Sequence, residues 1–272
     1  MNLYSKIRRY ARRFAVSGNK RKVSFIIGGT QKAGTTALHD YLEKHPEIGV
    51  ADKKEVHFFD NEEYFRGNKP DYSAYHFFFR HNPPHKLLGE ATPIYMYWYD
   101  APRRIWQYNP DMKIIVILRN PIDRAYSHWN MERYRKAESL SFWDALQCER
   151  ERCREALPYQ HRVYSYIDRG FYVKQLRRIW TYFPEDQTLI LRNEDIRRNP
   201  QKAVEDVCLF LGVRSPGRLK AQDIHSRPYI SPMSSREREY LRHVFEFEIK
   251  HLERILGWDC SEWLSEAGGL GN

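Results

Sequence analysis

The chain has 272 residues, of which 42% are hydrophobic and 29% are charged. This composition excludes a disordered chain and provides enough apolar surface for one large domain or two small ones. The formal net charge is +10, but eight basic residues and no acid lie in 1–22, which leaves about +2 for the rest of the chain. Because the remaining chain is nearly neutral and has no RNA-binding motif, we expect no nucleic-acid partner.

In chain order we expect a strand over Val23–Ile27, a helix over Thr35–His45, a strand over Lys86–Pro93, a helix over Ala101–Tyr108, a strand over Met112–Pro121, helices over Pro121–Arg135, Ser141–Ala156 and Gly170–Tyr182, a strand over Thr188–Asp195, and helices over Asn199–Gly212 and Ser234–Leu256. The strands are apolar on both faces, as in a parallel sheet covered on both sides. We therefore predict an α/β, P-loop-like three-layer fold with a central, mainly parallel sheet flanked by helices. The expected organisation is a basic segment over 1–22 and a single domain over 23–272, with a helical insertion over 137–169.

The basic segment 1–22 has Leu3, Ile7, Tyr10 and Phe14 at helical spacing. Such a helix can make a peripheral contact with an anionic membrane, or it can dock on the domain and add only solubility. No apolar run reaches the ~18 residues of a membrane span, and no signal peptide is apparent. The four cysteines form no CxxC pair or metal-ligand spacing. We therefore expect a cytoplasmic protein with reduced thiols and no metal site.

The first strand leads into a glycine-rich turn and a helix, a layout that holds phosphate through free amides at the helix N-terminus. Gly29 and Gly34 have the spacing of a Walker A loop, but Thr35 stands where the Walker lysine belongs. The lysine of this loop is Lys32, two residues before Gly34. The loop therefore predicts a phosphate site with an unusual lysine position.

The strand over Met112–Pro121 ends in Arg119 and Asn120, with no acid at its tip. A P-loop kinase needs an Asp at such a strand end to hold Mg²⁺, whereas arginine binds phosphate directly. Ser127 lies about two turns into the following helix, on the side expected to face the same phosphate. The pattern indicates a nucleotide with a phosphate at each strand end and no metal, and it disfavours the alternative of a kinase that uses ATP and Mg²⁺.

Five blocks in order resemble the PAPS-dependent sulfotransferases, most closely the branch with heparan sulfate sulfotransferases and bacterial homologues. The blocks are "GGTQKAGTT", "KKEVHFFD", "GEATPIYM", "LRNPIDRAYSHW" and "GFYVKQLRRIWTYFP" with "NEDIRRNPQKAVEDVCLFLGV". The resemblance covers about Val23 to Asp259. It implies that PAPS (3′-phosphoadenosine 5′-phosphosulfate) is the donor and PAP is the product.

The resemblance also implies which residues bind the donor. In that family the first loop binds the 5′-phosphosulfate and the second strand–helix unit binds the 3′-phosphate. The implied donor-binding residues are Lys32, Ala33, Gly34, Thr35, Thr36, Arg119, Ser127 and, from the poorly matched segment "HSRPYISPMS", Arg227.

Three residues are candidates for catalysis. Sulfuryl transfer resembles phosphoryl transfer, so positioning and charge stabilisation should dominate. Lys32 is expected to meet the bridging oxygen on which charge develops. Glu55 matches the family's general base, although His57 remains an alternative base or an orienting residue alongside Asp60.

The acceptor side is less clearly marked. Glu90 and Thr92 are expected to support the site from the third strand end, and Tyr95, His128 and Trp129 are candidates for an acceptor wall or for ordinary core packing. Two departures from the family pattern are Val56 for a proline and Ala91 for the lysine of glycosaminoglycan enzymes, and the second weakens the case for a polyanionic sugar. We expect a hydroxyl, or an amine, of a carbohydrate or small natural product.

Overall fold

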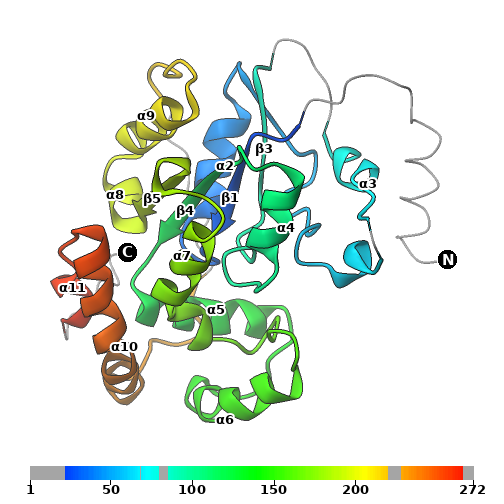
Figure 1. The fold of residues 1–272 in the computed structure, drawn as a ribbon. Helices are drawn as coiled ribbons and strands as arrows, with labels where there is room; N and C mark the ends of the chain where they lie inside the picture. The colour runs from blue at the N-terminus through cyan, green and yellow to red at the C-terminus, as the bar shows by residue number, and fades with distance from the viewer. Residues whose placement is uncertain (1–21, 68, 80–84, 220–227, 266–272) are drawn as a thin grey trace. The chain divides into compact units, whose positions relative to one another are not determined.

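The computed structural model describes residues 22–67, 69–79, 85–219 and 228–265 (Figure 1). Residues 1–21 and Arg227 lie outside these ranges, so the membrane contact and the nucleotide contact predicted for them stay predictions. In the described ranges, no helix has both the length and the apolar character that a membrane crossing requires.

The described residues form two compact units. Unit 1 comprises those within Met1–Thr30, Gly34–Ile117 and Trp180–Gln222, and unit 2 comprises those within Gln31–Ala33, Leu118–Ile179 and Asp223–Asn272. The predicted single domain over 23–272 and its insertion over 137–169 stay predictions.

Unit 1 is built on a five-stranded sheet with the order β2-β3-β1-β4-β5. The strands are β1 (Phe25–Gly29), β2 (Ile48–Val50), β3 (Leu87–Ala91), β4 (Lys113–Leu118) and β5 (Thr188–Arg192). β1 pairs in parallel with β3 and β4, and β3 pairs in parallel with β2. The predicted α/β fold with a parallel central sheet is confirmed.

The strands that were clearest in the sequence are buried on both faces. Every residue of β1 is buried, and so is every residue of β4 after Lys113. The ring of Phe25 packs so closely over β3 that a Cβ on Gly89 would lie 2.1 Å from it, so this position requires glycine. The continuous apolar pattern therefore reflects a sheet with no solvent-facing side at its centre.

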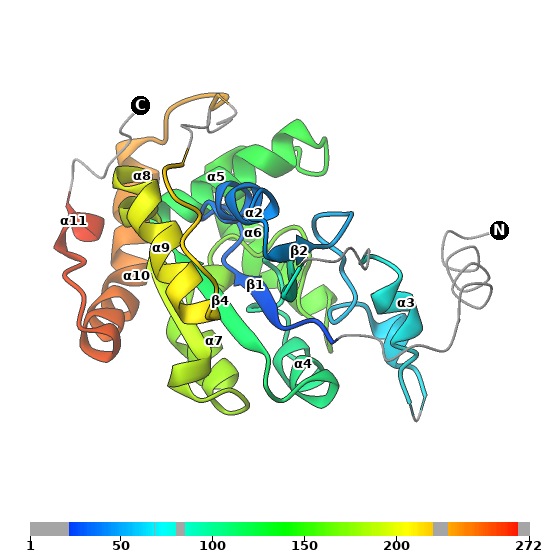
Figure 2. The same ribbon diagram turned by 90° about the horizontal axis from the view of Figure 1, so that it is seen from above.

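Helices lie on both faces of the sheet in unit 1. The helices of this unit are α2 (Thr35–Glu43), α3 (Ser73–His76), α4 (Ala101–Tyr108), α8 (Asn193–Arg198) and α9 (Pro200–Leu211), with 3₁₀ turns η1 (Glu62–Phe65) and η3 (Glu185–Gln187). α2 contacts β1, β2, β3 and α9. Figure 2 shows α4 on the opposite face of the sheet from α2, because the right-handed crossovers β1–α2–β2 and β3–α4–β4 run in opposite directions along the sheet. The three predicted layers are thus present.

Unit 2 is helical. Its elements are α5 (Pro121–Tyr134), α6 (Phe142–Glu155), the 3₁₀ turn η2 (Asp168–Gly170), most of α7 (Tyr172–Trp180), α10 (Ser235–Leu256) and α11 (Ser261–Leu264). The proline at the first turn of α5 follows Asn120, whose side chain accepts from the Ile122 amide. α10 begins with a capping box between Ser234 and Glu237.

One predicted element is wrong in part. The strand expected over Thr188–Asp195 ends at Arg192, and Asn193–Arg198 forms α8. Glu194 and Asp195 lie in the first turn of α8, where the helix dipole favours acids. The strand β2 was not predicted, because three residues are too few to show a hydrophobic period.

Candidate active site

The N-terminus of α2 in unit 1 is arranged for an anion. Gly34 is the N-cap, with φ of 89°, and no side chain caps the helix. A Cβ on Gly34 would lie 2.8 Å from Nδ2 of Asn193, so both the backbone conformation and the space favour glycine. Thr35 is buried and Thr36 is exposed at the first turn. The first amides of α2 therefore have no intrahelical or capping side-chain acceptor, as an anion site requires.

Lys32 and Arg119 are brought together in unit 2. Nη1 of Arg119 donates to the carbonyl oxygen of Lys32 over 3.1 Å, although the two residues are 87 positions apart. Nη2 of Arg119 lies 3.5 Å from the hydroxyl of Tyr229, and the Tyr172 hydroxyl donates to the Arg119 carbonyl over 2.9 Å. Ala33, next to Lys32, is fully buried. One guanidinium thus links the end of β4 to the lysine of the first loop.

Ser127, His128 and Trp129 lie on α5 and are buried. Nε1 of Trp129 donates to the Leu140 carbonyl over 3.1 Å, so the indole is anchored within unit 2. Burial, with the nearby charge of Arg169, lowers the pKa of His128 well below its usual value. A neutral imidazole is therefore expected. The roles predicted for these three residues in ligand binding stay predictions.

Three candidate residues of unit 1 form a hydrogen-bonded row. Nδ1 of His57 lies 2.9 Å from Oδ2 of Asp60, and Nε2 of His57 lies 3.5 Å from Oε2 of Glu55. Asp60 is fully buried, whereas Glu55 and His57 are partly exposed. Nζ of Lys54 lies 3.1 Å from the other Glu55 oxygen. The buried acid thus holds one nitrogen of the imidazole and leaves the other facing Glu55.

The row is strongly charged. The hydrogen bond from His57 lowers the pKa of Glu55 to about 2, against the opposing effect of burial. Burial would lower the pKa of His57, but Asp60 and Glu55 raise it to about 9. At neutral pH the row therefore contains an ionised Glu55 beside an imidazolium.

Glu90 on β3, with Thr92 and Tyr95 in the segment after this strand, forms a hydrogen-bond network next to this row. Oε2 of Glu90 accepts from Thr92 Oγ1 over 2.6 Å, and Oε1 accepts from the hydroxyls of Tyr95, over 3.2 Å, and Tyr75, over 2.7 Å. The Tyr95 oxygen also accepts from the amides of Phe58, over 3.0 Å, and Phe59, over 3.3 Å. The network therefore fixes the backbone directly after His57, and burial raises the pKa of Glu90 to about 7.

Burial places this network behind the row. Glu90, Thr92 and Tyr95 are each no more than 1% exposed. The supporting role expected of Glu90 and Thr92 stays a prediction, and so do the acceptor contacts proposed for all three residues. Sequence reasoning missed Tyr75, because one tyrosine among 19 carries no signal for a particular buried hydrogen bond.

The three candidate catalytic residues share a strained backbone. Four non-glycine residues of the described chain have positive φ: Lys32 at 72°, Glu55 at 60°, His57 at 54° and Lys136 at 59°. Such a conformation costs about 1–3 kcal/mol and persists only where surrounding contacts impose it. The contacts include the Arg119 bond to Lys32 and a bond from the Glu55 amide to the Ala91 carbonyl, 3.0 Å long. Residues held in such conformations are common at functional sites.

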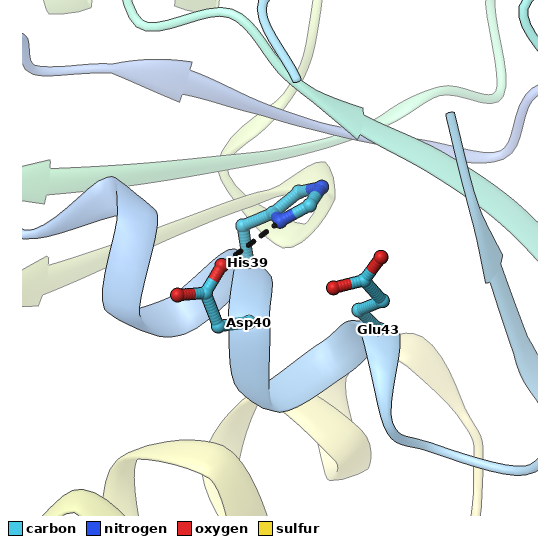
Figure 3. A group of neighbouring side chains, drawn as sticks. All are labelled: His39, Asp40 and Glu43. Atoms are coloured by element: carbon cyan, nitrogen blue, oxygen red, sulfur yellow. Dashed lines mark hydrogen bonds and ion pairs between the residues drawn. The ribbon is translucent and has the colours of Figure 1, made fainter. Parts of the chain in front are cut away.

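A separate group on α2 has the composition of a cation site. His39, Asp40 and Glu43 have ligand atoms within 4.8 Å of one another, and no second such group occurs among the residues the structure describes (Figure 3). Nδ1 of His39 already lies 3.4 Å from an oxygen of Asp40. The three residues are close in sequence on one helix, and no feature of the predicted chemistry uses them. The prediction that no metal is required stays a prediction.

The comparisons with known proteins agree with the motifs. The model of the sulfotransferase domain family matches residues 22–251. The chain belongs to the sulfotransferase domain family. This sulfotransferase is similar to a solved sulfotransferase from Alicyclobacillus acidocaldarius, with 29% identity and a TM-score of 0.77 over 90% of this chain and 100% of that one. The predicted family and the expectation of a sulfotransferase enzyme are confirmed.

Two human relatives act on heparan sulfate by name. The sulfotransferase is 31% identical over 201 residues to bifunctional heparan sulfate N-deacetylase/N-sulfotransferase 2, covering 71% of this chain and 22% of the relative. It is 32% identical over 207 residues to heparan sulfate glucosamine 3-O-sulfotransferase 6, covering 72% of this chain and 54% of the relative. The chain thus spans about a fifth of the first relative and about half of the second.

Proposed function

We propose that this enzyme transfers the sulfuryl group of PAPS to a hydroxyl, or an amine, of a carbohydrate or small natural product, and releases PAP. The observation that carries the proposal is Arg119 at the end of β4, with its guanidinium bonded to the carbonyl of Lys32 over 3.1 Å. A guanidinium binds phosphate in bidentate fashion and cannot hold Mg²⁺. The alternative kinase function, which needs a carboxylate near this strand end, is therefore disfavoured.

The residues present suit a doubly phosphorylated donor. The uncapped N-terminus of α2, with Gly34, Thr35 and Thr36, offers amides and hydroxyls to one anionic group. Arg119 offers donors to another, and Ser127 is proposed as its companion on α5. Lys32 and Ala33 complete the first loop in sequence. We assign the first set to the 5′-phosphosulfate and the second to the 3′-phosphate.

The chemistry divides between a leaving group and a proton. When bound, PAPS supplies a sulfuryl group whose bond to the 5′-phosphate breaks with its electron pair on the bridging oxygen. Lys32 stabilises that charge with its ammonium. Glu55 takes the proton of the acceptor as its oxygen or nitrogen forms the new bond to sulfur, and His57 is the alternative base. Asp60 holds the His57 ring in place.

Nucleotide binding in EDTA tests the proposed donor. PAP should bind in the presence of EDTA, because cationic side chains rather than a metal neutralise its phosphates. Isothermal titration should compare the binding of PAP in EDTA with the binding of ATP in the presence of Mg²⁺. A separate assay with labelled PAPS should measure turnover. Tighter binding of ATP with Mg²⁺ than of PAP would contradict the proposed donor.

Replacing Arg119 with alanine should weaken PAP binding by about 1.5–3 kcal/mol, the usual range for a hydrogen bond to a charged group. The loss should disappear for adenosine 5′-phosphate, which lacks the 3′-phosphate. Arg154→Ala is a matched control, because Arg154 lies on unit 2 with 67% of its side chain exposed. An equal loss for both nucleotides would show that Arg119 does not bind the 3′-phosphate.

The proposed acceptor class rests on the names of the relatives and on the residue at position 91. The names of the two human relatives include both N- and 3-O-sulfation of heparan sulfate, so an amine and a hydroxyl both stay within the proposal. Ala91 stands where the glycosaminoglycan enzymes of the family carry a lysine, and it is 1% exposed. Without that cation we propose an acceptor less anionic than heparan sulfate. A screen of neutral and sulfated sugars with labelled PAPS ranks the candidates.

A further inference from the structure

We propose that Arg169 is a positioning residue that acts through Gln31 to fix the backbone of Lys32. The inference rests on the proposed function, since it concerns the lysine assigned to the leaving group. Arg169 lies in η2, 138 positions from Gln31, and its Nη1 donates to Oε1 of Gln31 over 2.6 Å. Gln31 directly precedes Lys32, so this bond holds the loop next to its strained residue.

The guanidinium of Arg169 is held on every side. Besides the bond to Gln31, Nε donates to Ser165 Oγ over 2.8 Å and Nη2 donates to the Arg162 carbonyl over 2.6 Å. The residue is 1% exposed. A buried arginine fixed by two local bonds offers its third group in one direction, and that direction is the side chain of Gln31.

The turn that carries Arg169 is itself fixed by neighbouring helices. The carboxylate of Glu149, on α6, accepts from the amide of Ile167, at 2.7 and 2.9 Å, and from that of Asp168 over 2.8 Å. A Cβ on Gly170 would lie 2.5 Å from the ring of Phe245, on α10, so the turn packs closely there. α6 therefore contributes to the loop of Lys32 through η2, which gives the segment over 137–169 a part in the reaction.

Two arginines thus restrain one short loop. Arg169 binds the side chain of Gln31, and Arg119 binds the carbonyl of Lys32. The φ of 72° at Lys32 is unfavourable for a residue with a side chain, so neighbouring contacts must impose it. Arg169 and Lys32 also act on one buried acid: burial raises the pKa of Glu132, and Arg135, Arg169 and Lys32 lower it. That shared carboxylate offsets the repulsion between the two cations.

The experiment cuts the link while leaving Arg169 in place. Gln31→Ala removes the acceptor but keeps the bonds from Arg169 to Ser165 and Arg162. We expect kcat with PAPS to fall about 10- to 100-fold, as for a small displacement of a catalytic group. PAP affinity should be nearly unchanged, because the displaced Lys32 ammonium acts on the charge that develops in the transition state. Gln31→Glu should restore kcat, since a carboxylate accepts from the guanidinium.

Lys174→Ala is the matched control. Lys174 forms an ion pair with Asp168 of η2 over 2.5 Å, and 55% of its side chain is exposed. The Lys174→Ala variant should therefore leave kcat unchanged. A Gln31→Ala enzyme with the kcat of this control would overturn the proposal. So would failure of Gln31→Glu to recover, or a loss of PAP affinity that matches the loss of kcat.

Hydrogen exchange separates this inference from the donor assignment. Amides of the peptide over 26–38 should exchange faster in Gln31→Ala than in the wild type, because the loop loses a restraint. If the wild type does not use PAPS, the proposed function fails, yet faster exchange would still support the restraint by Arg169. Unchanged exchange in Gln31→Ala would overturn the restraint whatever the donor.

Discussion

Replacing Lys32 with alanine should lower kcat by about 10²–10³-fold, the usual loss when one group that stabilises developing charge is removed. PAP should still bind, because Arg119 and the α2 amides remain. The rate of a single turnover with labelled PAPS and calorimetric titration with PAP measure the two effects separately. A variant that keeps its turnover would remove Lys32 from the leaving-group role.

The strained backbone at Lys32 supplies a sharper comparison. Lys32→Gly should lose as much turnover as Lys32→Ala but be more stable, because glycine adopts a φ of 72° without strain. Lys136 is a matched control: it has a φ of 59° and an exposed side chain, and no role in the reaction is proposed for it. Lys136→Gly should raise stability and leave kcat unchanged. Full activity in Lys32→Gly would mean that the backbone, and not the ammonium, matters.

The sequence predicted those elements whose own residues determine them. β1 and β4 are apolar on both faces, and α5 begins at a proline directly after the polar cap Asn120. β2 was not predicted because three residues are too few to show a hydrophobic period. The start of α8 was predicted as strand because it continues directly from β5. Local patterns predict long elements well, whereas pairing in the sheet decides where short ones form.

In the candidate site, too, the sequence predicted the residues that belong to local motifs and missed those that are set by distant contacts. Lys32, Arg119 and Glu55 stood out because each occupies a special place in a short motif. The bond between Arg169 and Gln31 did not, because it joins residues 138 positions apart and neither lies in a distinctive spacing. The left-handed backbone of Lys32, Glu55 and His57 was also not predicted, since glycine or asparagine usually occupies such positions in a sequence. Contacts from distant segments, rather than local preference, impose them.

Replacing Glu55 with glutamine should lower kcat by about 10²–10⁴-fold, the range for loss of a general base. Glutamine keeps the size of the side chain and its acceptor oxygen, so the change mainly removes the charge and the basicity. His57→Gln is the companion variant, and Lys53→Ala, at an exposed position nearby in sequence, is the control. A near-normal kcat in Glu55→Gln, with a large loss in His57→Gln, would make His57 the base.

The pH dependence of kcat/KM decides between the two bases in the wild-type enzyme. Glu55, with a pKa of about 2, is ionised throughout the neutral range, and His57, with a pKa of about 9, is protonated there. If Glu55 takes the proton, the rate should be level across neutral pH, because Glu55 stays ionised there. If His57 takes the proton, the rate should instead rise with pH up to about 9, because only the neutral imidazole can accept. We expect the first profile.

In Glu55→Gln the pKa of His57 should fall, since one of the two carboxylates that raise it is gone. Any titration that belongs to His57 must then move to lower pH in this variant.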